Sequence, residues 1–111
     1  MIPPQHRYRL EDMRSYAQKA IEISKASGQD PQVRGLALER LIGIVGEAAS
    51  KVPDAVRSLA PQIEWRMVVG MRNILVHDYA STRADIIDSV IRDDLPALIA
   101  AIDRLLAEHP E

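Results

Sequence analysis

The chain has 111 residues, of which 47% are hydrophobic and 27% are charged. This is enough for one hydrophobic core and too little for two domains, and the absence of cysteine excludes a disulfide framework and a thiolate metal site. The net charge is −2 and the pI is about 5.9, whereas nucleic-acid-binding domains are usually basic, so any contact with RNA must come from a local basic patch.

The N-terminal segment lacks the apolar region of a signal peptide, and no run reaches the 18 apolar residues typical of a membrane span. We expect residues 1–6 to form a flexible N-terminal arm and residues 7–108 to form a single helical domain. We also expect a cytoplasmic protein without membrane contact.

The spacing of apolar residues is that of helices, and no segment alternates as a half-buried strand does. From Arg7 onward, apolar residues recur every three or four positions. This predicts a first helix that ends near Gly28, because glycine can adopt the left-handed conformation that closes a helix.

A second helix is predicted from Asp30 to about Lys51, because Asp30 is a good N-cap and Pro31 suits the first helical position. Each glycine inside a helix costs roughly 1 kcal/mol relative to alanine, so we expect another helix to approach closely at these positions. The three internal glycines are Gly35, Gly43 and Gly46.

Three further helical segments are predicted after the second. Residues 54–60 form a short one, and the next begins after Pro61 and contains residues 65–79. The last runs from residue 83 to 107, with a kink near Asp93-Asp94 because Pro96 removes a backbone hydrogen bond there. The predicted fold class is therefore all-α, an antiparallel bundle of four to five helices.

The helix that contains residues 65–79 has two apolar faces at 100° per residue. The first face consists of Met67, Val68, Met71, Ile74 and Leu75, and the second consists of Trp65, Val69 and Val76. A helix that is apolar on two faces is buried on two faces. We expect one face inside the bundle and the other against a second subunit of a homodimer. The alternative is that helices of the same chain cover both faces.

Arg72, Asn73 and His77 lie within this segment. Histidine transfers protons near neutral pH, arginine presents a charged fork to phosphate oxygens, and asparagine can orient a phosphate or a water. These residue types suit metal-independent RNA cleavage, but an Arg and a His five residues apart also occur in many helical proteins without chemistry. On a regular helix Arg72 and His77 point about 140° apart. Either the helix ends or distorts before His77, or the site joins two subunits.

Other charged residues are weaker candidates. Glu47 could pair with Arg72 or orient the site, and we take it as an auxiliary residue; a pair with another arginine or a solvated edge is equally compatible with the sequence. Arg7, Arg9 and Arg14 form the best candidate surface for RNA, although a solvated face is the favoured interpretation. No histidines and carboxylates have metal-ligand spacing, so we predict neither a metal nor a cofactor.

Residues 72–79, Arg-Asn-Ile-Leu-Val-His-Asp-Tyr, resemble the R-x4-H motif of HEPN-domain ribonucleases, and in particular the R-x4-H-x-Y form of HepT-type toxins. The resemblance extends over residues 8–106. Its other segments are Tyr8-x-x-x-Asp12-Met13, Gly46-Glu47-Ala48-Ala49, Trp65, Gly70-Met71 and Asp94-Leu95-Pro96-x-Leu98.

The resemblance implies a homodimeric RNase toxin with Arg72 and His77 as catalytic residues in a cleft between subunits and Asn73 as an auxiliary residue. It also implies a partner antitoxin, an MNT-type nucleotidyltransferase that silences the RNase by transferring AMP to Tyr79. The acidic pI and the low aromatic content of 4% favour an alternative, because aromatic side chains stack on bases. In this alternative the protein is a non-catalytic HEPN module that docks a nucleotidyltransferase or binds nucleotide.

Overall fold

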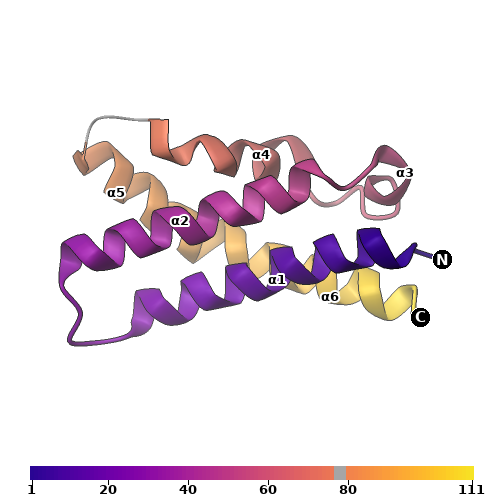
Figure 1. The fold of residues 1–111 in the computed structure, drawn as a ribbon, viewed down its shortest axis with the longest axis horizontal. Coiled ribbons are helices and arrows are strands. Elements are labelled where there is room, and N and C mark those ends of the chain that lie inside the picture. The colour runs from indigo at the N-terminus through magenta and orange to yellow at the C-terminus, as the bar shows by residue number, and fades with distance from the viewer. Residues whose placement is uncertain (77–79) are drawn as a thin grey trace.

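The structure is a computed structural model that describes residues 1–76 and 80–111, with side chains for residues 1–73 and 84–111 (Figure 1). The regular elements in these ranges are all helical, which confirms the predicted all-α class. They are α1 (Pro4–Lys25), α2 (Pro31–Ser50), α3 (Asp54–Arg57), α4 (Trp65–Gly70), the 3₁₀ helix η1 (Met71–Val76), α5 (Ala80–Ser89), the π-helical segment η2 (Val90–Asp94) and α6 (Leu95–Glu108). Within these ranges no helix combines the length and the hydropathy needed to cross a membrane.

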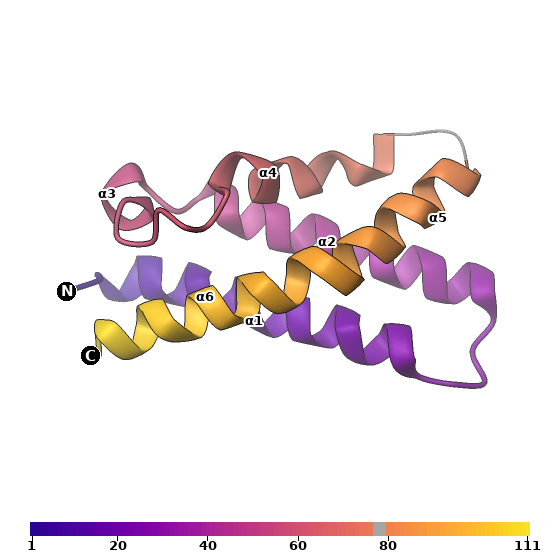
Figure 2. The same ribbon diagram turned by 180° about the vertical axis from the view of Figure 1, so that it is seen from behind.

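The helices form an antiparallel bundle. α1 packs against α2 on one side and against α6 on another, so that both chain ends lie at the same end of the bundle (Figure 1). α4 and η1 run along α2, and α5, η2 and α6 follow each other as one diagonal path across the opposite face (Figure 2). The core is one cluster of buried apolar side chains from all six α-helices.

The first residues of the chain pack on the bundle, in contrast to the flexible arm predicted for residues 1–6. α1 already begins at Pro4, and Ile2 is buried in the core. Proline fits the first helical turn because the N–H that it lacks would have no helical partner there. The Arg7 guanidinium donates to the carbonyl of His109 at 2.6 Å and lies 3.4 Å from the Glu111 carboxylate. These contacts fasten the start of α1 to the C-terminal end.

The predicted signals between the first two helices are confirmed. Gly28 has the left-handed backbone conformation, with φ of 81°, although α1 ends three residues earlier. The Asp30 side chain accepts hydrogen bonds from the N–H groups of Gln32 at 2.8 Å and Val33 at 3.2 Å, as an N-cap does. The predicted apolar stripe of α2 is buried: Leu38, Leu41, Ile42, Val45 and Ala49.

Gly46 sets the distance between α2 and η1. A Cβ atom at this position would collide with the backbone nitrogen of Arg72 and would lie 3.0 Å from the carbonyl oxygen of Val68. The expected close approach is therefore confirmed at Gly46. It is wrong at Gly35 and Gly43, where an added Cβ would meet nothing within 4 Å.

Trp65 is covered by its own chain. Its indole N–H donates to the carbonyl of Ala60 at 3.1 Å, and the guanidinium carbon of Arg57 lies 5.7 Å from the ring centroid. The assignment of Trp65 to a face that meets a second subunit is therefore wrong, because the α3 turn already buries it. The homodimer itself stays a prediction.

The winding changes at Met71, where the α-helix gives way to the 3₁₀ helix η1. A wheel at 100° per residue therefore does not apply beyond Gly70, since a 3₁₀ helix has three residues per turn. Val68 and Met71 are buried as predicted, but Met67, predicted on the same face, is 41% exposed. The helix is thus distorted before residue 77, which is one of the two arrangements expected for the site.

The predicted kink in the last helical region is also confirmed. Residues Val90–Asp94 have π-helical winding directly before α6, which has Pro96 in its first turn. Partial burial raises the pKa of the Asp94 carboxyl, and the negative charges of Asp93 and Glu64 raise it further.

Alanine substitutions at the three glycines of α2 should separate packing from helix propensity. Gly46→Ala should lower the free energy of unfolding by about 1–3 kcal/mol, because the methyl group forces η1 away from α2. Gly35→Ala and Gly43→Ala should each raise it by up to about 1 kcal/mol, because space is open and alanine favours the helix. Urea unfolding followed by circular dichroism measures all three. A stabilising Gly46→Ala would contradict the close contact.

Asp94→Asn should stabilise the fold at pH 7. A folded-state pKa above the unfolded value of about 3.9 means that the folded state binds the proton more tightly, so ionisation of Asp94 reduces stability as the pH rises through this range. The variant should therefore gain stability relative to wild type between pH 3 and pH 7 in thermal unfolding. An advantage of the same size at both pH values would contradict this cause.

Candidate functional site

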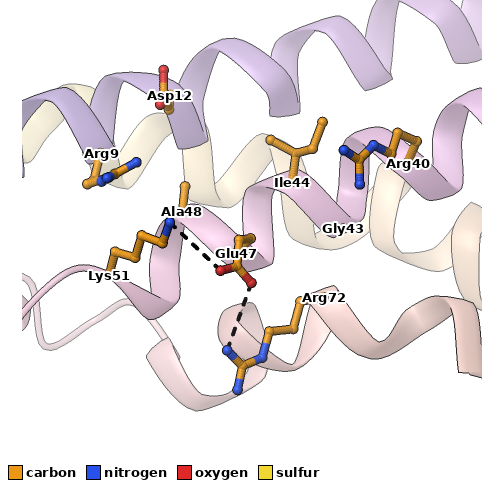
Figure 3. Close-up of a pocket in the computed structure, with 9 residues that line it drawn as sticks. All are labelled: Arg9, Asp12, Arg40, Gly43, Ile44, Glu47, Ala48, Lys51 and Arg72. Carbon is orange, nitrogen blue, oxygen red and sulfur yellow. Dashed lines mark ion pairs between the residues drawn. The ribbon is translucent and has the colours of Figure 1, made fainter.

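A pocket of about 350 Å³ lies between α1, α2 and η1 (Figure 3). Four of its lining residues are cations and two are carboxylates. The cations are Arg9, Arg40, Lys51 and Arg72, the carboxylates are Asp12 and Glu47, and Gly43, Ile44 and Ala48 complete the wall. The pocket is thus a local basic patch on a chain whose net charge is −2.

The sequence of α2 places one edge of this pocket on a single helix face. Arg40, Gly43, Glu47 and Lys51 follow each other at spacings of three or four residues. Residues at such spacings lie above one another on a helix. The neighbouring face of α2 holds the buried apolar stripe, so the core fixes the direction in which the charged face points.

Arg72 enters the pocket from η1. Its backbone is held against Gly46, and its side chain is 45% exposed. Its Nη1 atom lies 4.0 Å from the carboxylate of Glu47, which is also 4.0 Å from the Nζ atom of Lys51 (Figure 3). The predicted pairing of Glu47 with Arg72 is therefore present in the structure. Such exposed pairs contribute little to stability, so Arg72 remains available to an anion.

Asn73 lies on the other flank of η1. Its exposed side chain lines a smaller pocket with Met67 and Ile86, so the structure does not bring it together with the pocket that Arg72 lines. The predicted catalytic His77 and the predicted AMP acceptor Tyr79 lie outside the described residues. Their positions relative to Arg72 therefore stay predictions.

The basic surface predicted on the first helix is divided in the structure. Arg14 pairs with both carboxylate oxygens of Asp103 on α6, and this hydrogen bonding raises the pKa of Arg14. Arg7 is held at the C-terminal end, as described above. Only Arg9 of the three lines the pocket. The sequence alone did not indicate that Arg9 lies near Arg40 and Lys51. Arg40 and Lys51 could have been identified from their spacing relative to Glu47, which places all three on one face of a helix.

The opposite flank of α4 has the opposite charge. A pocket of about 210 Å³ there is lined by Glu64, Asp93 and Asp94 around the exposed Met67. The segment that contains Arg72 therefore separates a basic pocket from an acidic one. A polyanion would be attracted to the first and repelled by the second.

No group of three histidine or carboxylate side chains converges in the described part of the chain. Because His77 and Asp78 lie outside it, the expectation of no metal stays a prediction.

Known proteins resemble this chain over most of its length. The family model "Ribonuclease HepT-like" matches residues 9–105. A Thermococcus cleftensis protein named "Probable ribonuclease HepT" is 30% identical over 69 residues, which cover 62% of this chain and 63% of that protein, slightly less than two thirds. A "Putative RNase" of Methanocaldococcus jannaschii is 27% identical over 93 residues, covering 80% of this chain and 85% of its own length. A second protein so named in that organism is 23% identical over 106 residues, covering 92% and 91%.

No solved structure matches the chain. The family match nevertheless takes in the Gly46 contact, Arg72 and all the helices that line the basic pocket. The chain therefore belongs to the ribonuclease HepT-like family.

Proposed function

We propose that this protein is an endoribonuclease that cleaves RNA without a metal ion, with Arg72 and His77 as its catalytic residues. The observation that supports the proposal most is the position of Arg72. Its backbone is fixed against Gly46, and its guanidinium lies exposed at the edge of a basic pocket. The relatives named as ribonucleases support the same reaction class.

The proposed reaction uses the substrate's own nucleophile. The 2′-oxygen attacks the adjacent phosphorus, His77 handles the proton that moves between the 2′-hydroxyl and the departing 5′-oxygen, and a 2′,3′-cyclic phosphate is formed. Arg72 stabilises the negative charge that develops on the phosphate oxygens. Glu47 is the auxiliary residue that orients Arg72, and Asn73 would act on a part of the substrate that reaches the other flank of η1.

The proposal includes a homodimer and a toxin–antitoxin setting. Two copies of Arg72 and His77 would line a cleft between subunits, and the partner antitoxin would be an MNT-type nucleotidyltransferase that transfers AMP to Tyr79. An AMP group adds bulk and negative charge seven residues after Arg72. It would therefore block RNA by occlusion and by charge repulsion.

The second candidate is a non-catalytic HEPN module that docks a nucleotidyltransferase or binds nucleotide. The ion pair between Glu47 and Arg72 is compatible with it, because the pair gives Arg72 a structural partner in the absence of RNA. The low aromatic content of 4% favours it. Cleavage assays with site variants distinguish the two candidates.

Arg72→Ala and His77→Ala should each reduce the rate of RNA cleavage by roughly 10²–10⁴-fold, as expected for loss of charge stabilisation or of a proton-transfer group. Arg66→Ala is the matched control, because Arg66 is an exposed arginine of α4 that does not line the pocket. It should leave the rate unchanged. Purified wild-type protein that cuts no RNA in the absence of a partner would contradict the enzyme proposal.

Co-expression with an MNT-type nucleotidyltransferase should increase the mass of the protein by about 329 Da for each AMP group attached. The increment should be absent in Tyr79→Phe and present in Tyr8→Phe, the control for an exposed tyrosine elsewhere. Intact-mass spectrometry measures both. An unmodified wild-type protein would remove the AMP switch from the proposal.

A further inference from the structure

The pocket between α1, α2 and η1 holds more positive charge than one catalytic arginine accounts for (Figure 3). Arg72 lies at its η1 edge, and Arg9, Arg40 and Lys51 line the rest. Neither Arg9 nor Arg40 forms an ion pair with a carboxylate among the described residues. The pocket's four cations outnumber its two carboxylates, Asp12 and Glu47, and a bound anion would offset the excess positive charge.

Gly43 leaves one wall of the pocket open to a ligand. It lies in the interior of α2 and lines the pocket, and a Cβ atom there would meet nothing within 4 Å. Glycine weakens a helix interior relative to alanine, and at Gly46 the contact with η1 requires it. At Gly43 no described neighbour requires it. An open glycine on the wall of a charged pocket allows a ligand to approach the helix backbone closely.

Arg40 and Lys51 begin from well-separated positions of the backbone. Arg40 and Lys51 lie on the same face of α2, separated along the helix axis by about 16 Å at the rise of an α-helix. A row of phosphates can contact both side chains along the helix, whereas a single phosphate would require both to extend fully toward each other. This geometry therefore fits a polynucleotide backbone better than an isolated phosphate group.

We propose that this pocket binds successive phosphates of the RNA strand beside the cleaved bond. Arg40, Lys51 and Arg9 contact phosphates, and the strand passes over Gly43. The inference depends on the proposed function for the identity of its ligand. It does not depend on the chemistry of that function, since phosphate binding needs neither a catalytic histidine nor a 2′-hydroxyl.

Glu47 has a defined part in this binding site. It lies 4.0 Å from both Lys51 and Arg72, between the two cations in Figure 3. It is thus an internal counter-ion in the position where a phosphate would be attracted. An incoming phosphate competes with this carboxylate, so removal of its charge should strengthen binding.

The test uses a fluorescent twelve-nucleotide single-stranded oligothymidylate made of DNA, which has the phosphates but cannot be cleaved through a 2′-hydroxyl. Binding is followed by fluorescence anisotropy at several salt concentrations. Arg40→Gln should weaken binding about 3- to 10-fold and make the slope of log affinity against log salt less negative by about 0.7. The control Arg92→Gln removes a charge from a 70% exposed side chain outside the pocket, and should change affinity less than about twofold.

Two further variants give results that a loss of fold would not produce. Gly43→Ala should weaken binding about 3-fold or more although it stabilises the helix, because the methyl group displaces the strand. Gly35→Ala, an equally open glycine of α2 outside the pocket, should stabilise the helix without weakening binding. Glu47→Gln should strengthen binding about 2- to 5-fold, because it removes a competing negative charge.

Several outcomes would overturn the inference. Unchanged affinity in Arg40→Gln would do so even if RNA cleavage requires Arg72. Binding of pyrophosphate or ADP that depends on Arg40, without binding of the oligonucleotide, would assign the pocket to free nucleotides. A Gly43→Ala variant with altered molar mass in light scattering and unaltered binding would assign this face to a contact between copies. Conversely, binding that depends on Arg40 and Gly43 in a protein that cleaves no RNA would support the phosphate site while the proposed enzyme function fails.

Discussion

The contact between Gly46 and the backbone of Arg72 determines how the rest of the site is built. Because Gly46 has no side chain, η1 lies directly against α2, and this contact fixes the backbone position of Arg72. The same contact brings Arg72 to the charged face of α2, where Glu47 lies within 4.0 Å. A larger residue at position 46 would separate the two elements, and the pocket would lose one wall. Helix stability and the geometry of the pocket are therefore linked at one position, because glycine weakens the helix interior here but allows η1 to approach α2.

Charge is distributed unevenly around this contact, and the distribution explains how an acidic protein can have a basic pocket. The basic pocket lies on one flank of the α4–η1 segment, and the acidic group of Glu64, Asp93 and Asp94 lies on the other. Several other cations are engaged in holding the bundle together, as Arg7 and Arg14 are with the C-terminal helix and its end. Net charge therefore describes the solubility of the chain better than its binding properties, which depend on the local pattern.

Much of the fold could be predicted from the sequence because the signals are local. The Asp30 cap, the apolar stripe of α2 and the kink before Pro96 each depend on residues a few positions apart. The predictions that failed depend on how α4 packs against the elements around it. Trp65 was assigned to a subunit contact because a helical wheel does not include the α3 turn that covers it. Met67 was assigned to the core because it lies one helical turn before Met71, but it borders two surface pockets and is 41% exposed.

The candidate site was predictable only in part, for the same reason. The motif around Arg72 is continuous in sequence, but the basic pocket combines residues of three elements, so that neither Arg9 nor Arg40 stood out before the fold was known.

The central claim, cleavage through the substrate's 2′-hydroxyl, is tested most directly by mass spectrometry of the RNA fragments produced in the presence of EDTA. Fragments that end in a 2′,3′-cyclic phosphate, together with no cleavage at a position whose 2′-hydroxyl has been removed, are the expected result. Fragments with 5′-phosphate and 3′-hydroxyl ends, or cleavage that EDTA abolishes, would contradict the claim.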